Sequence, residues 1–289
     1  LTAYGYIDMG LTDTNEAGAA GARSQDFTEY EIGLSFAPAE SKWSAVVELS
    51  YGKEGNGTEV NGVNVQDDAT TSFETAAVTY QHNDALSFSF GNLYTYQGLE
   101  SHDAPNNNFI SYAGRANNDL YSANFAEGVS ADYSAGDITV GVWAEADAGA
   151  DFEYYAAYSG IANLTLSVAI ADNEDGSGTD NFMAVYEMGD FTISAETVDT
   201  ENAAGVEEVD VTSIAVAYSM GDTTIAVRSV DGDYNEGPGQ GNLNGDYEKI
   251  SIAAFHALSD NVAVGVEYSE EELNNDDFET IGVELLYVF

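Results

Sequence analysis

The stretch WSAVVELSY, residues 43–51, alternates apolar and polar side chains with a period of two. Trp43, Val47 and Leu49 share one set of alternate positions, and Glu48 belongs to the other. Successive side chains of a β-strand point to opposite faces. The stretch therefore predicts a strand with one apolar face and one polar face.

The same alternation recurs along the chain, and no stretch carries a helical apolar stripe. Further alternating segments lie at 29–37, 85–94, 137–146, 191–198, 223–230, 261–269 and 280–289. Short turns lie at 37–42, 81–84, 134–137, 159–163, 187–190, 219–222 and 256–260. Long acidic loops rich in Gly and Asn lie at 12–26, 52–71, 95–118, 146–151, 171–181, 199–210, 231–246 and 270–278. Seven turns and eight loops predict sixteen antiparallel strands in a single domain over residues 1–289, and one merged or missed hairpin would give fourteen or eighteen.

A transmembrane barrel explains this pattern better than a β-sandwich, whose strands also alternate. Short turns at one end and long loops at the other are typical of outer-membrane barrels. The apolar faces carry almost no charge, as contact with lipid requires, because Lys or Arg at the bilayer midplane costs roughly 2–4 kcal/mol. An aromatic residue precedes each turn, as expected of an interfacial girdle. These residues are Phe36, Tyr80, Tyr133, Tyr158, Tyr186, Tyr218 and Phe255. Phe255 falls outside the apolar alternation of its segment, so we expect a bulge or a shifted register there.

Composition excludes several classes of function. The 289 residues include 6 Lys and Arg against 51 Asp and Glu, a formal net charge of −45, which excludes nucleic acid as a partner. The absence of cysteine excludes disulfides, thiol catalysis and Cys-based metal sites. The sequence has no apolar run long enough for a transmembrane helix and no signal peptide at residue 1. A barrel in the outer membrane then implies that a signal peptide has already been removed.

Both ends and the middle of the chain resemble the Gram-negative general diffusion porins. The opening LTAYGYIDMGL, residues 1–11, is similar to the family's first strand, V-T-L-Y-G-x-I-D-x-G. The closing Tyr287-Val288-Phe289 resembles the terminal aromatic signature read by the barrel-assembly machinery, with Phe289 as the assembly signal. The segment RANNDLY, residues 115–121, looks like the strand that leaves the family's third loop.

The resemblance implies a sixteen-stranded barrel in the bacterial outer membrane, in contact with lipid and lipopolysaccharide. It implies a homotrimer whose third loop, here residues 95–118, folds into the lumen as a constriction loop. The family's Pro-Glu-Phe-Gly pattern is absent from this loop, which reads GLESHDAPNNNFISYAGRA over 98–116. The family's detailed pore lining therefore does not transfer to this chain.

If the apolar faces contact lipid, the opposite positions line the lumen. They hold Glu29, Glu31, Glu48, Asp132, Glu145, Glu196, Glu267 and Glu284, against Arg228 and Lys249. Family members carry an arginine cluster opposite acidic groups of the third loop, and Arg115 and Arg228 are its best remnants here. We expect Glu100 and Asp103 of the loop to reach the constriction; the alternative is that they bind the loop's own amides. The excess of carboxylates predicts cation preference, although carboxylates at the rims also serve to solvate strand ends.

Two acidic loops contain weak candidate metal ligands. Asp231, Asp233 and Asn235 occupy positions one, three and five of an EF-hand-like run, but position six is Glu236 rather than Gly. The run DNEDGSGTD, residues 172–180, offers further carboxylates. We expect no cofactor, and calcium or magnesium bound at these loops remains an open alternative.

The sequence predicts a passive diffusion pore for small hydrophilic solutes and ions, and no enzyme. Ser101, His102 and Asp103 are triad residue types, but adjacent residues do not form a catalytic relay. Two alternatives remain open. One is a substrate-specific channel, for example for oligosaccharides, with Tyr94, Tyr96, Phe109 and Tyr112 as stacking residues; the other is a barrel whose loops serve binding or adhesion.

Overall fold

The computed structural model describes residues 1–16, 23–60, 63–100, 103–114, 120, 125–146, 151–205, 207–235, 245–274 and 276–289. These residues form sixteen strands and one short 3-10 helix, η1 (Ala104–Asn106). The strands are β1 (Thr2–Glu16), β2 (Arg23–Phe36), β3 (Trp43–Val60), β4 (Val63–Gln81), β5 (Leu86–Tyr94), β6 (Phe125–Ala135), β7 (Ile138–Glu145), β8 (Phe152–Ile161), β9 (Leu164–Asp172), β10 (Gly178–Met188), β11 (Phe191–Glu201), β12 (Glu207–Met220), β13 (Thr223–Tyr234), β14 (Gly245–Ser259), β15 (Val262–Leu273) and β16 (Asp276–Val288). Within the described ranges, no helix is long and apolar enough to cross a membrane.

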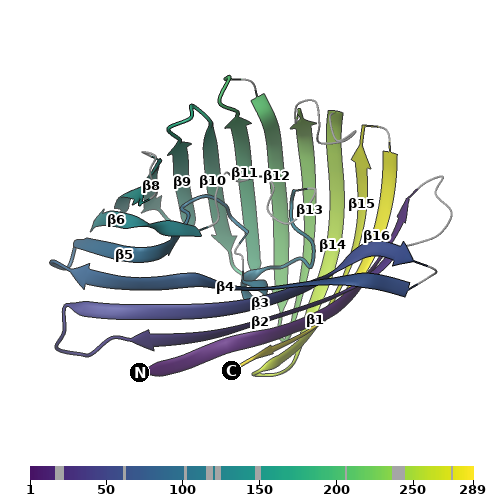
Figure 1. Ribbon diagram of the computed structural model, residues 1–289, viewed down its shortest axis with the longest axis horizontal. Coiled ribbons are helices and arrows are strands. Elements are labelled where there is room, and N and C mark those ends of the chain that lie inside the picture. The colour runs from purple at the N-terminus through teal and green to yellow at the C-terminus, as the bar shows by residue number, and fades with distance from the viewer. Residues whose placement is uncertain are drawn as a thin grey trace.

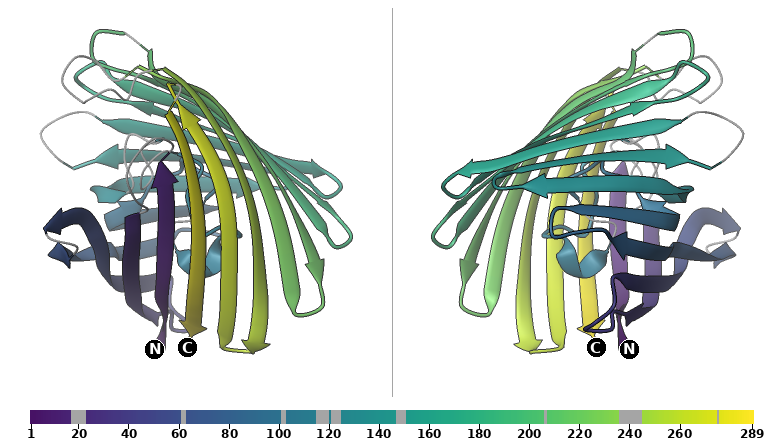
Figure 2. Two further views of the ribbon diagram at one scale, coloured as in Figure 1. Left: turned by 90° about the vertical axis from the view of Figure 1, so that its right-hand side faces the viewer. Right: turned by 90° about the vertical axis from the view of Figure 1, so that its left-hand side faces the viewer.

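The strands form one closed antiparallel barrel in which each strand pairs with its neighbours in sequence (Figure 1). Pairing of β1 with β16 closes the barrel. At this seam the Gly5 N–H donates to the Phe289 carbonyl at 3.2 Å, and the Phe289 N–H donates to the Gly5 carbonyl at 3.0 Å. Both termini lie side by side at one end of the barrel (Figure 2). The prediction of a sixteen-stranded closed barrel is confirmed.

Alternation along the strands separates an apolar outer face from a mixed inner face. In β13, Ile225 and Val227 are exposed on the outside, while Ala226, Arg228 and Val230 are buried on the inside. A barrel in lipid requires this arrangement, because its outer surface contacts hydrocarbon. Polar groups are therefore concentrated on the inner face.

The aromatic residues at the short turns lie on the outer face, with one exception. Phe36, Tyr133, Tyr158 and Tyr186 are exposed there. Phe255 instead points inward, as its place outside the apolar alternation suggested, and packs with a cluster that includes Phe109 of the constriction loop. The register shift in this hairpin comes after Phe255, between Ala257 and Ser259.

Several strands extend further than the sequence predicted. Residues 52–71 were expected to be a long loop, but β3 and β4 remain paired as far as Val60 and Val63. That expectation is wrong for the described backbone. β3 and β4 stay hydrogen-bonded to each other beyond the part of the barrel whose outer face is apolar, because the backbone hydrogen bonds between two strands do not depend on contact with lipid.

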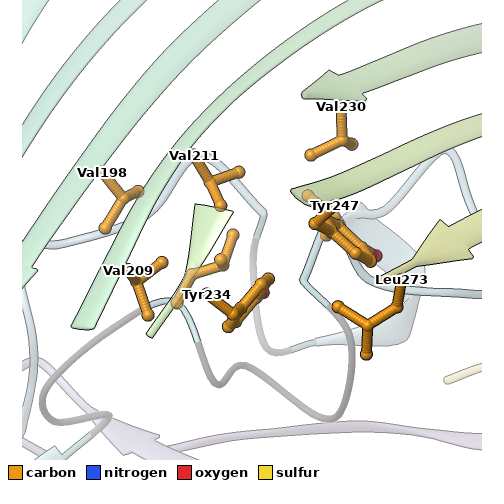
Figure 3. Close-up of a cluster of buried hydrophobic side chains, with 9 residues drawn as sticks. Val198, Val209, Val211, Val230, Tyr234, Tyr247 and Leu273 are labelled. Carbon is orange, nitrogen blue, oxygen red and sulfur yellow. The ribbon is translucent and has the colours of Figure 1, made fainter. Parts of the chain in front are cut away.

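A cluster of buried apolar side chains fills part of the barrel interior between the wall and the constriction loop (Figure 3). The rings of Tyr234 and Tyr247 meet edge to face with centroids 5.2 Å apart. The Tyr247 hydroxyl donates to the carbonyl of Ala113 in the loop at 3.2 Å. The loop is therefore part of the packed interior.

Candidate functional site

The constriction loop leaves β5 after Tyr94. Hydrogen bonds join its described parts, residues 95–100 and 103–114, to the inner faces of β6, β8, β10, β11 and β13 to β15. Its first contact is with Glu153 of β8, which is buried. Glu153 accepts hydrogen bonds from the Thr95 hydroxyl at 2.6 Å, the Tyr96 N–H at 2.8 Å and the Gln97 side-chain amide at 2.7 Å. One buried carboxylate thus fixes the start of the loop.

The next residues of the loop bind to β10 and β11. The Asn181 side-chain oxygen accepts from the Gly98 N–H at 2.9 Å, and Glu196 accepts from the Leu99 N–H at 3.1 Å. Asn181 also donates to Glu196 at 2.8 Å. Gly98 has a φ of 94°, a conformation that favours glycine. The wall side chains therefore bind backbone amides that the loop leaves unpaired.

The returning part of the loop binds to β15. Glu267 accepts from the Ile110 N–H at 2.5 Å, the Ser111 N–H at 2.8 Å and the Ser111 hydroxyl at 2.5 Å. Within the loop, Glu100 accepts from the Ala113 N–H at 2.7 Å. Glu100 thus binds one of the loop's own amides, as the alternative expected, and it also pairs with Arg228 of the wall.

Three residues predicted to line the open lumen are covered by the constriction loop. Glu196, Glu267 and Arg228 lie on the inner face as expected, but they are only 3%, 3% and 1% exposed. These residues therefore lie on the lumen side of the wall but beneath the constriction loop, rather than facing the open channel. Their charges are used to bind the loop because its buried amides and carbonyls need partners.

The wall formed by β1 to β6 carries carboxylates that bind tyrosine hydroxyls. These pairs have in common a phenol as the donor and a carboxylate as the acceptor. They are Tyr4 with Glu48, Tyr6 with Glu29 at 2.5 Å, Tyr94 with Glu74 at 3.2 Å, and Tyr96 with Asp132 at 2.6 Å. A neutral phenol orients a carboxylate without cancelling its charge, so this wall remains negative.

Further along the loop, Asp103 also reaches this wall. Carboxylate oxygens of Asp103, Glu31 on β2 and Glu74 on β4 lie within 4.8 Å of one another. Burial, followed by the negative charges of Glu74 and Glu48, raises the pKa of Asp103 to about 6, and a hydrogen bond with Glu31 acts in the opposite direction. Asp103 therefore loses its charge in mildly acidic solution.

The two cations expected in the lumen are both buried and paired. Arg228 forms an ion pair with Glu100, and the Lys249 Nζ lies 3.6 Å from Glu271. Lys249 also donates to the Tyr112 carbonyl at 2.8 Å. Among the inward-facing charges whose side chains the structure describes, those that retain exposure are therefore carboxylates. Arg115, like Ser101 and His102, lies outside the described residues.

The EF-hand-like run is partly strand. Asp231 and Asp233 lie on β13, which continues to Tyr234, and both are exposed on the outward side. Asn235 follows the strand, and its N–H donates to the Glu208 carbonyl at 2.7 Å. The expected loop conformation is wrong for residues 231–234, because β13 stays paired with β12 and β14 there.

Aromatic rings near the constriction loop pack on one another. Tyr96 stacks on Tyr155 with centroids 5.2 Å apart, and Tyr94 meets Phe125 edge to face at 6.0 Å. Phe109 is buried. Their faces are therefore largely used within the protein, which weakens the alternative of a continuous stacking path for sugars.

Comparisons with known proteins place this barrel in a family. The family profile described as Gram-negative porin matches residues 1–276. No curated protein sequence matches the chain.

Among solved structures, OmpF of Salmonella typhi in complex with daunomycin has a TM-score of 0.71 at 14% identity, covering 100% of this chain and 97% of that one. OprB of Pseudomonas putida at high pH has a TM-score of 0.74 at 9% identity, covering 99% and 93%. A mutant porin of Rh. blastica has a TM-score of 0.62 at 14% identity, covering 100% and 99%. At these identities the structures support the fold, while the profile supports the family. The chain belongs to the Gram-negative porin family and is an outer-membrane channel.

Proposed function

We propose that the chain is a passive, cation-preferring diffusion channel for small hydrophilic solutes and ions. One observation carries the proposal: the inward-facing cations Arg228 and Lys249 are buried and paired, whereas the carboxylates of the β1 to β6 wall are held by neutral tyrosines. A permeating ion therefore meets negative charge.

Simple electrostatics supports the sign of this preference. Two unit charges about 4 Å apart in water interact by about 1 kcal/mol, and by more beside a low-dielectric wall. A lining of several carboxylates raises the local cation concentration and lowers that of anions. Diffusion through such a pore needs no catalytic group and no cofactor.

Reversal potentials in asymmetric KCl test the proposal. Wild-type protein in planar bilayers is expected to prefer K⁺, and Glu48→Gln is expected to lower the cation/anion permeability ratio. Glu248→Gln is the matched control, because Glu248 is exposed on the outward side of β14. Anion preference of the wild type, or equal effects of the two variants, would show that the conducting surface is misassigned.

We further propose that the channel is a homotrimer in contact with lipopolysaccharide, with Phe289 as its assembly signal. Support comes from the family alone. Native mass spectrometry in mild detergent should give a trimer, and a monomer at all detergent concentrations would contradict the proposal.

A further inference from the structure

We propose that Arg228 is a positioning residue that fixes the constriction loop to the wall and so sets the size of the pore, without acting on permeating ions through its charge. This inference rests on the proposed diffusion function. The family resemblance identifies Arg228 as a remnant of the positive cluster that faces acidic groups of the third loop, whereas the inference assigns it a positioning role instead.

The guanidinium of Arg228 holds two separate parts of the loop at once. Its Nη1 pairs with the Glu100 carboxylate on the outgoing part. Its Nη2 donates to the Ser111 carbonyl and hydroxyl, both at 3.0 Å, and to the Tyr112 carbonyl at 2.9 Å, on the returning part. A single side chain on β13 therefore joins both parts of the loop to the barrel.

The surroundings of Arg228 leave little access for ions. The Phe109 ring covers the guanidinium, with its centroid 4.3 Å from Cζ. On the wall side, Nη2 lies 3.3 Å from the Ser251 hydroxyl and 3.8 Å from the Glu267 carboxylate. Arg228 is 1% exposed; its Nη1 and Nη2 are paired with loop and wall groups, whereas the buried Nε has no hydrogen-bond partner among the described residues.

Loss of Arg228 would leave neighbouring carboxylates without their cation. Glu267 is itself 3% exposed, and Glu100 accepts a hydrogen bond from the Ala113 N–H as well as pairing with Arg228. Breaking a buried ion pair by removing one partner is strongly destabilising, since the other charge stays buried. We expect the loop to respond by moving off the wall into the lumen.

A planar guanidinium is required for this geometry. Its fixed fork of donors can bind a carboxylate on one side and two carbonyls on the other, whereas a lysine ammonium is a compact point charge on a flexible stem. Arg228→Lys therefore keeps the charge but loses the simultaneous contacts. This variant separates positioning from charge.

The test compares Arg228→Met, Arg228→Lys and Glu100→Gln in bilayers and in liposome swelling with neutral sugars of increasing size. Lys42→Met is the control for lost positive charge, because Lys42 is exposed at a short turn. If Arg228 positions the loop, all three site variants lose the single conductance level and change the sugar size limit in the same direction. Lys42→Met should behave as wild type.

A purely electrostatic role predicts a different result. Arg228→Met and Glu100→Gln remove opposite charges, so they would shift the cation/anion permeability ratio in opposite directions. Arg228→Lys would behave as wild type, and the sugar size limit would stay unchanged in all three variants. That outcome would overturn the inference while leaving the cation-preferring channel intact. Anion preference of the wild type would instead overturn the proposed function. If Arg228→Met fails to assemble, Arg228→Lys and Glu100→Gln still decide between the two roles.

Discussion

Replacing Asp103 by Asn removes one charge from the three carboxylates that the constriction loop and the facing wall bring together. Because oxygens of Asp103, Glu31 and Glu74 lie within 4.8 Å of one another, a cation in contact with one interacts with all three. For a cation about 4.8 Å from the Asp103 carboxylate, the attraction is about 0.9 kcal/mol in water, and about 0.5 kcal/mol after screening over a Debye length of about 10 Å at about 0.1 M salt. That energy corresponds to about a 2.5-fold change in local cation concentration.

We therefore expect Asp103→Asn to lower the K⁺/Cl⁻ permeability ratio about twofold at about 0.1 M KCl, and to have little effect at about 1 M, where the Debye length is about 3 Å. The assay is the reversal potential across a planar bilayer at a fixed salt ratio. An unchanged ratio at low salt would show that ions do not pass this cluster.

The same group gives the wild-type channel a pH dependence. Since the pKa of Asp103 is raised to about 6, the group is charged above this pH and neutral below it. Cation preference should therefore fall as the pH is lowered through about 6, and Asp103→Asn should lack this step. Asp175→Asn is the control, because hydrogen bonds from the Ser177 hydroxyl and N–H lower the pKa of the exposed Asp175. A step that persists in Asp103→Asn would refute the assignment.

Three further predictions concern stability, assembly and metal dependence. Tyr96→Phe removes the hydroxyl that donates to Asp132 at 2.6 Å. It should lower the free energy of unfolding by about 1.5 kcal/mol, as is typical of a hydrogen bond to a charged group. Denaturant unfolding of refolded barrels measures this energy, and an unchanged value would mean that water replaces the phenol. Phe289→Ala should reduce the yield of barrel in the outer membrane relative to Leu1→Ala at the opposite terminus, as judged by heat-modifiable migration, and equal yields would exclude the assembly role. Removal of calcium and magnesium by a chelator should leave conductance and selectivity unchanged in detergent-purified protein, whereas a reversible change on adding either ion back would reveal a required metal.

The strands were predictable from sequence because lipid imposes a strict rule on one face. WSAVVELSY and its counterparts alternate so regularly that the parity of each residue could be assigned without coordinates. Phe255 stood out from that parity, and it faces the interior in the structure. The ends of the strands were less predictable. Outside the part of the barrel whose outer face is apolar, strands and loops are built from similar polar residues.

The site was harder to predict because it depends on the path of the constriction loop. Parity placed Arg228 and Glu267 on the inner face, but only the loop's contacts show that both are covered. Glu74 was missed because the β3–β4 pairing shifts register next to it, between Val47 and Leu49. A bulge of this kind shifts the side-chain alternation by one residue, so a simple period-two assignment fails beyond it.

The hydrogen bonds between Gly5 and Phe289 also set the order in which the protein can be completed. Until β16 meets β1, the sheet has two open edges, each able to pair with a foreign strand. Bringing the two ends of a flexible chain of 289 residues together costs about 5 kcal/mol of entropy. Closure must therefore come last and must be driven by pairing already formed along the sheet. An incomplete chain, however well its first hairpins form, is left with edges that invite aggregation.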